Sequence, residues 1–106
     1  MIRPTEACMS AARRAAKVDA NQSEIVAALR GAGATVQPLH DVGRGCPDLL
    51  VGFRGTNYTI EVKDGEKPPS KRKLTPDQVR WHGDWRGRVV VVTGVDDALR
   101  AIGALN

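Results

Sequence analysis

Hydrophobic and polar residues alternate along this 106-residue chain in two patterns, one with the period of a helix and one with the period of a β-strand. The helical pattern first appears at residues 21–33, where apolar side chains recur every three or four positions. Asn21 and Glu24 have the spacing of a capping box at the start of this segment, and Gly31 and Gly33 close it. The pattern predicts one amphipathic helix.

A second helix is predicted over residues 74–85 of the chain. Thr75, Pro76 and Gln78 repeat the capping-box pattern, with proline at the first helical position, where a helix tolerates it best. Trp81 and Trp85 share one stripe of this helix with Gln78 and His82. We expect that stripe to face a sheet; the alternatives for the two tryptophans are stacking on nucleic-acid bases and a dimer contact.

The strand-like pattern predicts three extended segments. Residues 34–39 form one short strand, residues 46–65 a hairpin, and residues 87–94 a β-branched run of the kind that is buried on both faces. A terminal amphipathic helix follows at 95–105. The order α-β-β-β-α-β-α is typical of one α/β domain, with a mixed sheet flanked by helices.

The hairpin carries polar residues where a core is expected. Its apolar alternation lies on one face only if odd positions of the first strand pair with even positions of the second. A turn at Gly55-Thr56 achieves this by pairing Val51 with Ile60. The acids and the lysine of the hairpin then share the opposite face.

In this register Asp48 lies across from Lys63, and Glu61 is the diagonal neighbour of Asp48 at about 7–8 Å. Two carboxylates that extend from such positions can converge on one divalent cation such as magnesium. The alternative is a solvated face with a cross-strand ion pair, which contributes about 0–1 kcal/mol and requires no function. Leu50 between the charges and Pro47 before Asp48 favour the site.

Composition narrows the class of protein. The net charge of +4 permits a polyanionic partner. Cys8 and Cys46 are too few for a disulfide framework and fit a reducing cytoplasm. No apolar run approaches the ~18 residues of a membrane span, and the basic start lacks the pattern of a secretory signal.

A zinc site built from His40, Cys46 and His82 has no supporting ligand spacing.

Pro47-Asp48, twelve intervening residues and Glu61-Val62-Lys63 resemble the signature of the PD-(D/E)xK nucleases. The order of elements matches the restriction-endonuclease-like core of that superfamily. Within it, the chain is similar to small phage and bacterial VRR-NUC and Holliday-junction-resolvase-like nucleases. The similarity implies an enzyme that hydrolyses phosphodiester bonds in DNA with Mg²⁺, or Mn²⁺ as a substitute, in the cytoplasm of a bacterial host cell.

The resemblance also assigns roles within the domain, which we expect to cover residues 21–106. The expected metal ligands are Asp48, Glu61, the backbone carbonyl of Val62 and, as a further acid, Glu24. Lys63 is expected to stabilise the transition state as an ammonium group, and Gln78 to act at the same site. Glu24 and Gln78 each have a structural alternative as the closing residue of a capping box.

Basic residues surround the proposed site, either as phosphate contacts or as a solvated surface. The expected contacts are Arg44, Lys67, Lys71, Arg72 and Lys73, joined by Arg13, Arg14 and Lys17 from a basic, alanine-rich arm at residues 1–20. No membrane or organic cofactor is expected as a partner.

The sequence is compatible with several DNA substrates and with more than one oligomeric state. Branched or structured DNA is the first hypothesis. The alternatives are a nuclease that degrades linear duplex or single-stranded DNA, and a binding module that keeps the fold without turnover. A resolvase must nick two symmetric strands, so the resemblance implies a homodimer. Its self-contacts would come from the arm, a sheet edge, or the terminal helix around Leu99 and Ile102.

Overall fold

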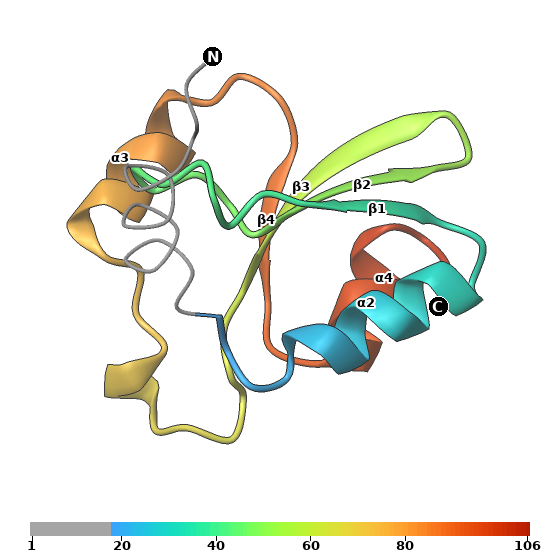
Figure 1. The fold of residues 1–106 in the computed structure, drawn as a ribbon, viewed down its shortest axis with the longest axis horizontal. Coiled ribbons are helices and arrows are strands. Elements are labelled where there is room, and N and C mark those ends of the chain that lie inside the picture. The colour runs from blue at the N-terminus through green and yellow to red at the C-terminus, as the bar shows by residue number, and fades with distance from the viewer. Residues whose placement is uncertain (1–17) are drawn as a thin grey trace, which may run out of the picture.

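The computed structural model describes residues 18–106. The predictions for Cys8, Arg13, Arg14 and Lys17 lie outside these residues. The described elements are α2 (Gln22–Gly31), β1 (Thr35–Pro38), β2 (Leu49–Phe53), β3 (Thr56–Val62), the 3-10 helix η1 (Pro69–Lys71), α3 (Pro76–Asp84), β4 (Val89–Val92) and α4 (Val95–Ala101) (Figure 1). Their order confirms the predicted α/β arrangement.

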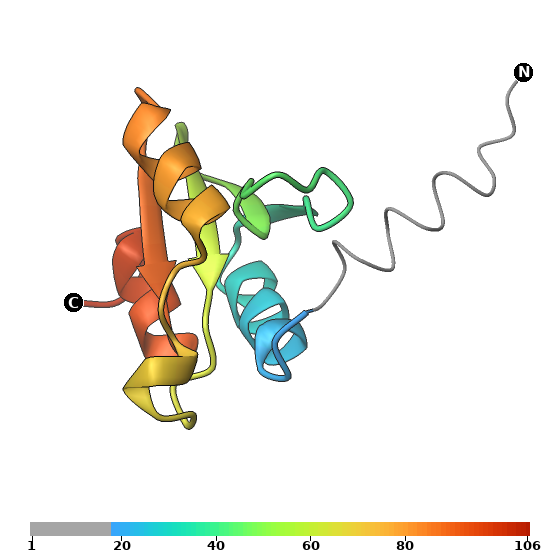
Figure 2. The same cartoon turned by 90° about the vertical axis from the view of Figure 1, so that its left-hand side faces the viewer.

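The four strands form one mixed sheet in the order β1-β2-β3-β4. The first three strands are antiparallel, and β4 lies parallel to β3 at the edge. Helices α2 and α4 lie together on one face of the sheet (Figure 1). Helix α3 lies on the other face, where Gln78 reaches Glu61; Figure 2 views the molecule from this side.

The expectation that the last strand is buried on both faces is wrong. Val91 is 43% exposed, and within β4 only Val92 is buried. Among the described strands, β4 pairs with β3 alone, and α4 covers one of its faces. Its run of valines therefore reflects strand propensity on a half-covered edge.

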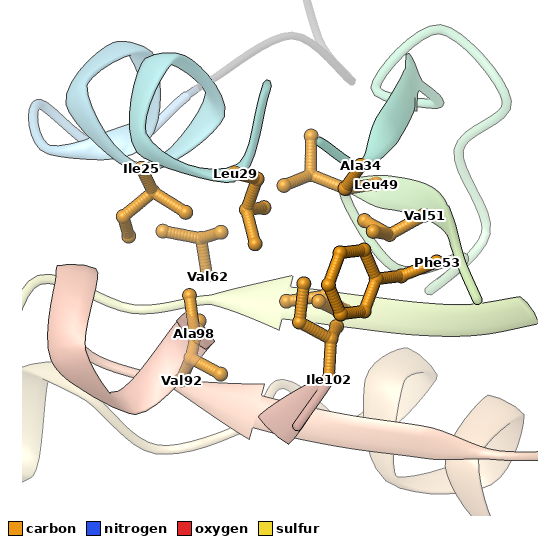
Figure 3. Close-up of a cluster of buried hydrophobic side chains, with 11 residues drawn as sticks. Ile25, Leu29, Ala34, Leu49, Val51, Phe53, Val62, Val92, Ala98 and Ile102 are labelled. Atoms are coloured by element: carbon orange, nitrogen blue, oxygen red, sulfur yellow. The ribbon is translucent and has the colours of Figure 1, made fainter. Parts of the chain in front are cut away.

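The hydrophobic core lies between the sheet and the pair of helices α2 and α4 (Figure 3). Its buried members are Ile25, Leu29, Ala34, Leu49, Val51, Phe53, Ile60, Val62, Val92, Ala98 and Ile102. The apolar face predicted for the hairpin is therefore correct. Ile102 is only 3% exposed, so it belongs to the core and does not offer the self-contact that we expected there. None of the described helices is long and apolar enough to cross a membrane.

The predicted hairpin register is wrong by two residues. The turn is at Arg54-Gly55, with φ of 51° and 82°, the left-handed pair that a two-residue hairpin turn requires. Val51 consequently pairs with Tyr58, not with Ile60. A shift of two leaves every side chain on its predicted face, because the side-chain period of a strand is two. It brings the two acids of the hairpin closer together than expected.

The two predicted capping boxes have different outcomes. Thr75 and Gln78 form the reciprocal box at the start of α3. Asn21 is the N-cap of α2, but its side chain makes no capping bond. Its Nδ2 donates to the carbonyl oxygens of Lys63 at 3.3 Å and Thr93 at 3.1 Å. Asn21 thus ties the start of α2 to the ends of β3 and β4 and leaves Glu24 without a capping role.

Candidate active site

The two hairpin acids meet at the open end of the β2–β3 ladder. The ladder pairs Leu49 with Ile60, so one step further Asp48 falls directly opposite Glu61. The backbone N–H of Val62 donates to Asp48 Oδ2 at 2.7 Å, which fixes the orientation of this carboxylate. The carbonyl of Asp48 accepts from the N–H of Leu39 at 2.7 Å. Asp48 is therefore held from both neighbouring strands.

Glu61 is a buried acid, only 2% exposed to solvent. Burial, and after it the neighbouring Asp48 carboxylate, raise the pKa of Glu61 to about 9, against a smaller lowering by Lys63. The neighbouring carboxylate disfavours ionisation of Glu61, and the charge of Lys63 offsets this effect only in part. Without a metal cation, the raised pKa therefore favours the protonated form of Glu61 at neutral pH.

Gln78 connects the helix start to the site. Its Oε1 accepts from the Thr75 N–H at 2.9 Å, closing the capping box, and from Lys63 Nζ at 2.9 Å. Because Oε1 receives both donors, the amide nitrogen faces the other way and donates to Glu61 Oε2 at 3.1 Å. The capping role and the site role, which the sequence presents as alternatives, are thus performed by one side chain.

Lys63 directly follows β3, one pleat beyond Glu61 and on the same side of the hairpin. Its Nζ is 3.9 Å from Glu61 Oε2, and its side chain is 12% exposed. The bond to Gln78 holds the ammonium group at the mouth of the site. Lys63 is therefore held beside the acids, on the face of the hairpin where the sequence predicts it.

His82, which the sequence analysis places on one helix stripe with Gln78 without assigning it a role, also faces Glu61. Its Nε2 lies 3.9 Å from Glu61 Oε1, and its side chain is 14% exposed. Both atoms are buried and have no hydrogen-bond partner among the described residues. Burial, followed by the charge of Lys63, lowers the pKa of His82 and favours the neutral ring. Helix spacing was the available signal, since His82 is one turn beyond Gln78.

A cleft of about 760 Å³ opens over these side chains. It is lined by Asp19, Asp48, Glu61, Val62, Lys63, Lys67, Pro68, Lys71, Thr75 and Gln78. Asp19 is a site residue that the sequence reasoning missed, because it falls in the stretch assigned to the arm. Partial burial raises the pKa of Asp19, while Lys63 and Lys67 lower it.

Not every predicted site residue enters this cleft. Glu24 is exposed and lines a separate hollow with Asp64 and Glu66. Arg44 lines another hollow, against α3. Of the predicted basic loop, Lys67 and Lys71 reach the cleft, whereas Arg72 and Lys73 are not among its lining residues.

The donor set of the cleft suits a hard divalent cation. Asp48 and Glu61 offer carboxylate oxygens, and Val62 lines the same cleft and bonds Asp48 through its backbone N–H. Glu61 Oε1 is a buried acceptor without a partner in the described part of the chain. Within residues 18–106, no three histidine, cysteine or carboxylate side chains gather as a metal cage. Magnesium is commonly bound through one or two carboxylates, with water and substrate phosphates as the other ligands. The residues present fit such an ion.

The fold and the paired acids beside a lysine place the chain in the nuclease-fold class of α/β domains. A solved structure described as a "VRR_NUC domain" is 32% identical to this chain, with a TM-score of 0.58. The match covers 76% of this chain and 88% of that one. No protein-family model matches the chain, and neither does any curated protein. The structural match shows that the chain belongs to the VRR-NUC family, which confirms the predicted family and fold class.

Proposed function

We propose that this protein is a metal-dependent endonuclease that hydrolyses phosphodiester bonds in DNA. The observation that carries the proposal is the meeting of Asp48, Glu61 and Lys63 in one cleft, with Gln78 bonded to the last two. An acid pair alone would suit many cation sites. A lysine held beside it adds a positive charge where a phosphate oxygen would lie.

Asp48, Glu61 and the backbone carbonyl of Val62 would hold the cation, Mg²⁺ or its substitute Mn²⁺. When bound, such an ion supplies Lewis acidity and lowers the pKa of water. The chain's own contribution is to keep two carboxylates together that would otherwise repel. The Val62 N–H fixes Asp48, and Gln78 fixes Glu61. The high pKa of Glu61 means that it must give up a proton when the cation binds.

Lys63 has a different task from the acids. Its ammonium group, held by Gln78 Oε1, faces the cleft and stabilises negative charge that develops on the phosphate. Lys67 and Lys71 line the same cleft and would contact neighbouring phosphates. Lys63→Ala should therefore abolish turnover and leave cation binding in place.

Branched or structured DNA is the substrate that we propose, on the strength of the likeness to resolvase-like nucleases. Cutting two symmetric strands would require a homodimer. The exposed edge strand β4, with Val91 on its surface, is a self-contact that the fold makes available. Light scattering on the free protein and on its DNA complex tests this assembly. A monomer in both states would favour a nuclease that makes single cuts.

A substrate panel tests the activity itself. Labelled four-way junctions, flaps, linear duplexes and single strands are incubated with the protein in Mg²⁺, Mn²⁺ or EDTA. Asp48→Asn and Glu61→Gln should each lower the cleavage rate by at least about a hundredfold, because each removes a ligand charge at the reacting centre. Asp96→Asn, at an exposed position of α4, is the matched control. Wild-type rates in either site variant would rule out this assignment.

A further inference from the structure

Trp81 of α3 and Trp85, the residue that follows the helix, form an aromatic pair beside the loop before β2. They stack on each other, with ring centroids 4.6 Å apart and planes 18° from parallel. Trp85 is 47% exposed, and α3 buries none of its residues. The end of α3 thus presents to solvent the half-exposed surface of one indole ring that is backed by a second.

This surface forms a wall of a hollow of about 180 Å³ between α3 and the loop before β2. The lining residues are Arg44, Asp77, Arg80, Trp81, Asp84 and Trp85. The loop side is held in place. Gly43, Arg44 and Gly45 have φ of 75°, 55° and 83°, and a Cβ on Gly45 would overlap the backbone of Asp77. Arg44 is a non-glycine residue in the left-handed region, a costly conformation that is typical of functional loops.

The chemistry of the lining favours a flat polar ligand over an apolar side chain. Four of its six residues are charged. Asp77 and Arg80 pair with each other at 3.1 Å, whereas an apolar occupant would cover Arg44 and Asp84 without offering either a polar partner. Indole and guanidinium planes both stack on nucleobases, and aspartate accepts hydrogen bonds from the exocyclic amino group of a base. Exposed Arg86 and Arg88 lie one and three residues after Trp85 and add positive charge for a polyanion.

The hollow also lies at a suitable place relative to the cleft. Gln78, which bonds Glu61, and Trp85 are on the same helix stripe, seven residues apart. That separation is about 10 Å along a helix axis, the length of about three stacked bases. A strand whose phosphate lies at the acids can therefore place a nearby base against Trp85.

We propose that the hollow of Arg44, Trp81 and Trp85 is a subsite for one unpaired nucleobase of the DNA strand near the cut. The subsite rests on the proposed action on DNA and specifies the feature that is recognised, a base free of its partner. Stacking on an aromatic side chain is tolerant of sequence, so the subsite selects structure rather than sequence.

Binding without cleavage tests the subsite. Labelled duplexes that carry a single-stranded extension are compared with blunt duplexes of the same sequence, in EDTA. Trp85→Ala should weaken binding of the extended duplex about tenfold and leave the blunt duplex unchanged. Trp85→Phe should retain most of the affinity, and the extended duplex should quench the tryptophan fluorescence of the wild-type protein.

Three outcomes would overturn the subsite: equal loss on both duplexes, no loss on either, or a change in oligomeric state in Trp85→Ala, which would make the hollow a contact between copies. The nuclease proposal fails separately. Fluorescence quenching and a Trp85-dependent preference for extended duplexes, in a protein that cleaves no DNA in Mg²⁺, would support the subsite and refute the nuclease.

Discussion

Gln78 Nε2 donates to Glu61 Oε2 at 3.1 Å, which makes the residue that caps a helix a direct partner of a proposed metal ligand. The amide oxygen of Gln78, Oε1, closes the capping box by accepting from the Thr75 N–H. The start of α3 and the geometry of the acids therefore depend on each other.

The two roles of Gln78 can be separated by a pair of variants. Gln78→Glu keeps an acceptor for the capping box, which glutamate closes as well as glutamine does, but loses the donor to Glu61. Its cleavage rate should fall about tenfold or more. Thr75→Ala removes the cap and should cost about 0.5–2 kcal/mol in the free energy of unfolding with a much smaller loss of rate. Similar losses of rate in both variants would contradict the site role.

His82 should act through Glu61. A small rotation would bring its neutral Nε2–H to Glu61 Oε1, giving two buried atoms the partner that each lacks. His82→Leu should weaken Mg²⁺ binding about 10–100-fold by calorimetry, as loss of a residue that orients a metal ligand does. His82→Gln supplies an amide donor and should restore part of the affinity. Equal affinity in all three proteins would make His82 a packing residue only.

The stability of the metal-free protein should depend on pH through Glu61. Its pKa is about 9 in the folded chain and 4.5 ordinarily, so the folded state binds the proton more tightly. The free energy of unfolding should therefore fall as the pH rises from about 4.5 towards about 9, where unfolded chains have lost this proton and the folded chain still holds it. The lowered pKa of His82 acts with the opposite sign below its ordinary value of 6.5, so the fall should be clearest above about pH 7.

Thermal unfolding in EDTA measures this dependence. Glu61→Gln carries no titrating group at position 61 and should show a flatter profile over the same range. Saturating Mg²⁺ should also flatten the wild-type profile, because the cation favours the ionised carboxylate. Parallel profiles for the wild type and Glu61→Gln would show that Glu61 is already ionised in the folded chain.

The lysines of the cleft should set the salt dependence of DNA binding. Each phosphate contact contributes about 0.9 to the slope of log affinity against log salt on duplex DNA. Removing both Lys67 and Lys71 by alanine substitution should lower that slope by up to about 1.8. Arg30 and Arg100, exposed on α2 and α4, provide a charge-matched control pair. An unchanged slope would show that neither lysine contacts a phosphate.

How far the sequence predicts this site depends on periodicity. The alternation of apolar residues fixes which face of the hairpin carries Asp48 and Glu61, and a slip of two residues preserves that face. The slip itself is not predictable from the pattern, because it depends on Arg54 adopting a left-handed conformation that glycine or asparagine adopts more readily.

Residues outside a regular pattern give less information. Asp19 precedes the first helix, and no spacing links it to the cleft that it lines. The stripe of α3 is readable, but it does not say that one flank, with His82, faces Glu61 while the other, with Trp85, faces a loop. The orientation of α3 about its own axis depends on a tertiary contact, the close approach of the loop to the start of the helix.

The loop approach at Gly45 has a consequence for how this sequence can vary. Both its φ of 83° and the Asp77 backbone against it exclude any side chain, so a mutation there would displace α3 from the acids. Gly83, on the same helix, has open space around it. Among descendants that keep this arrangement, position 45 should remain glycine under purifying selection, while position 83 drifts to residues that favour helices.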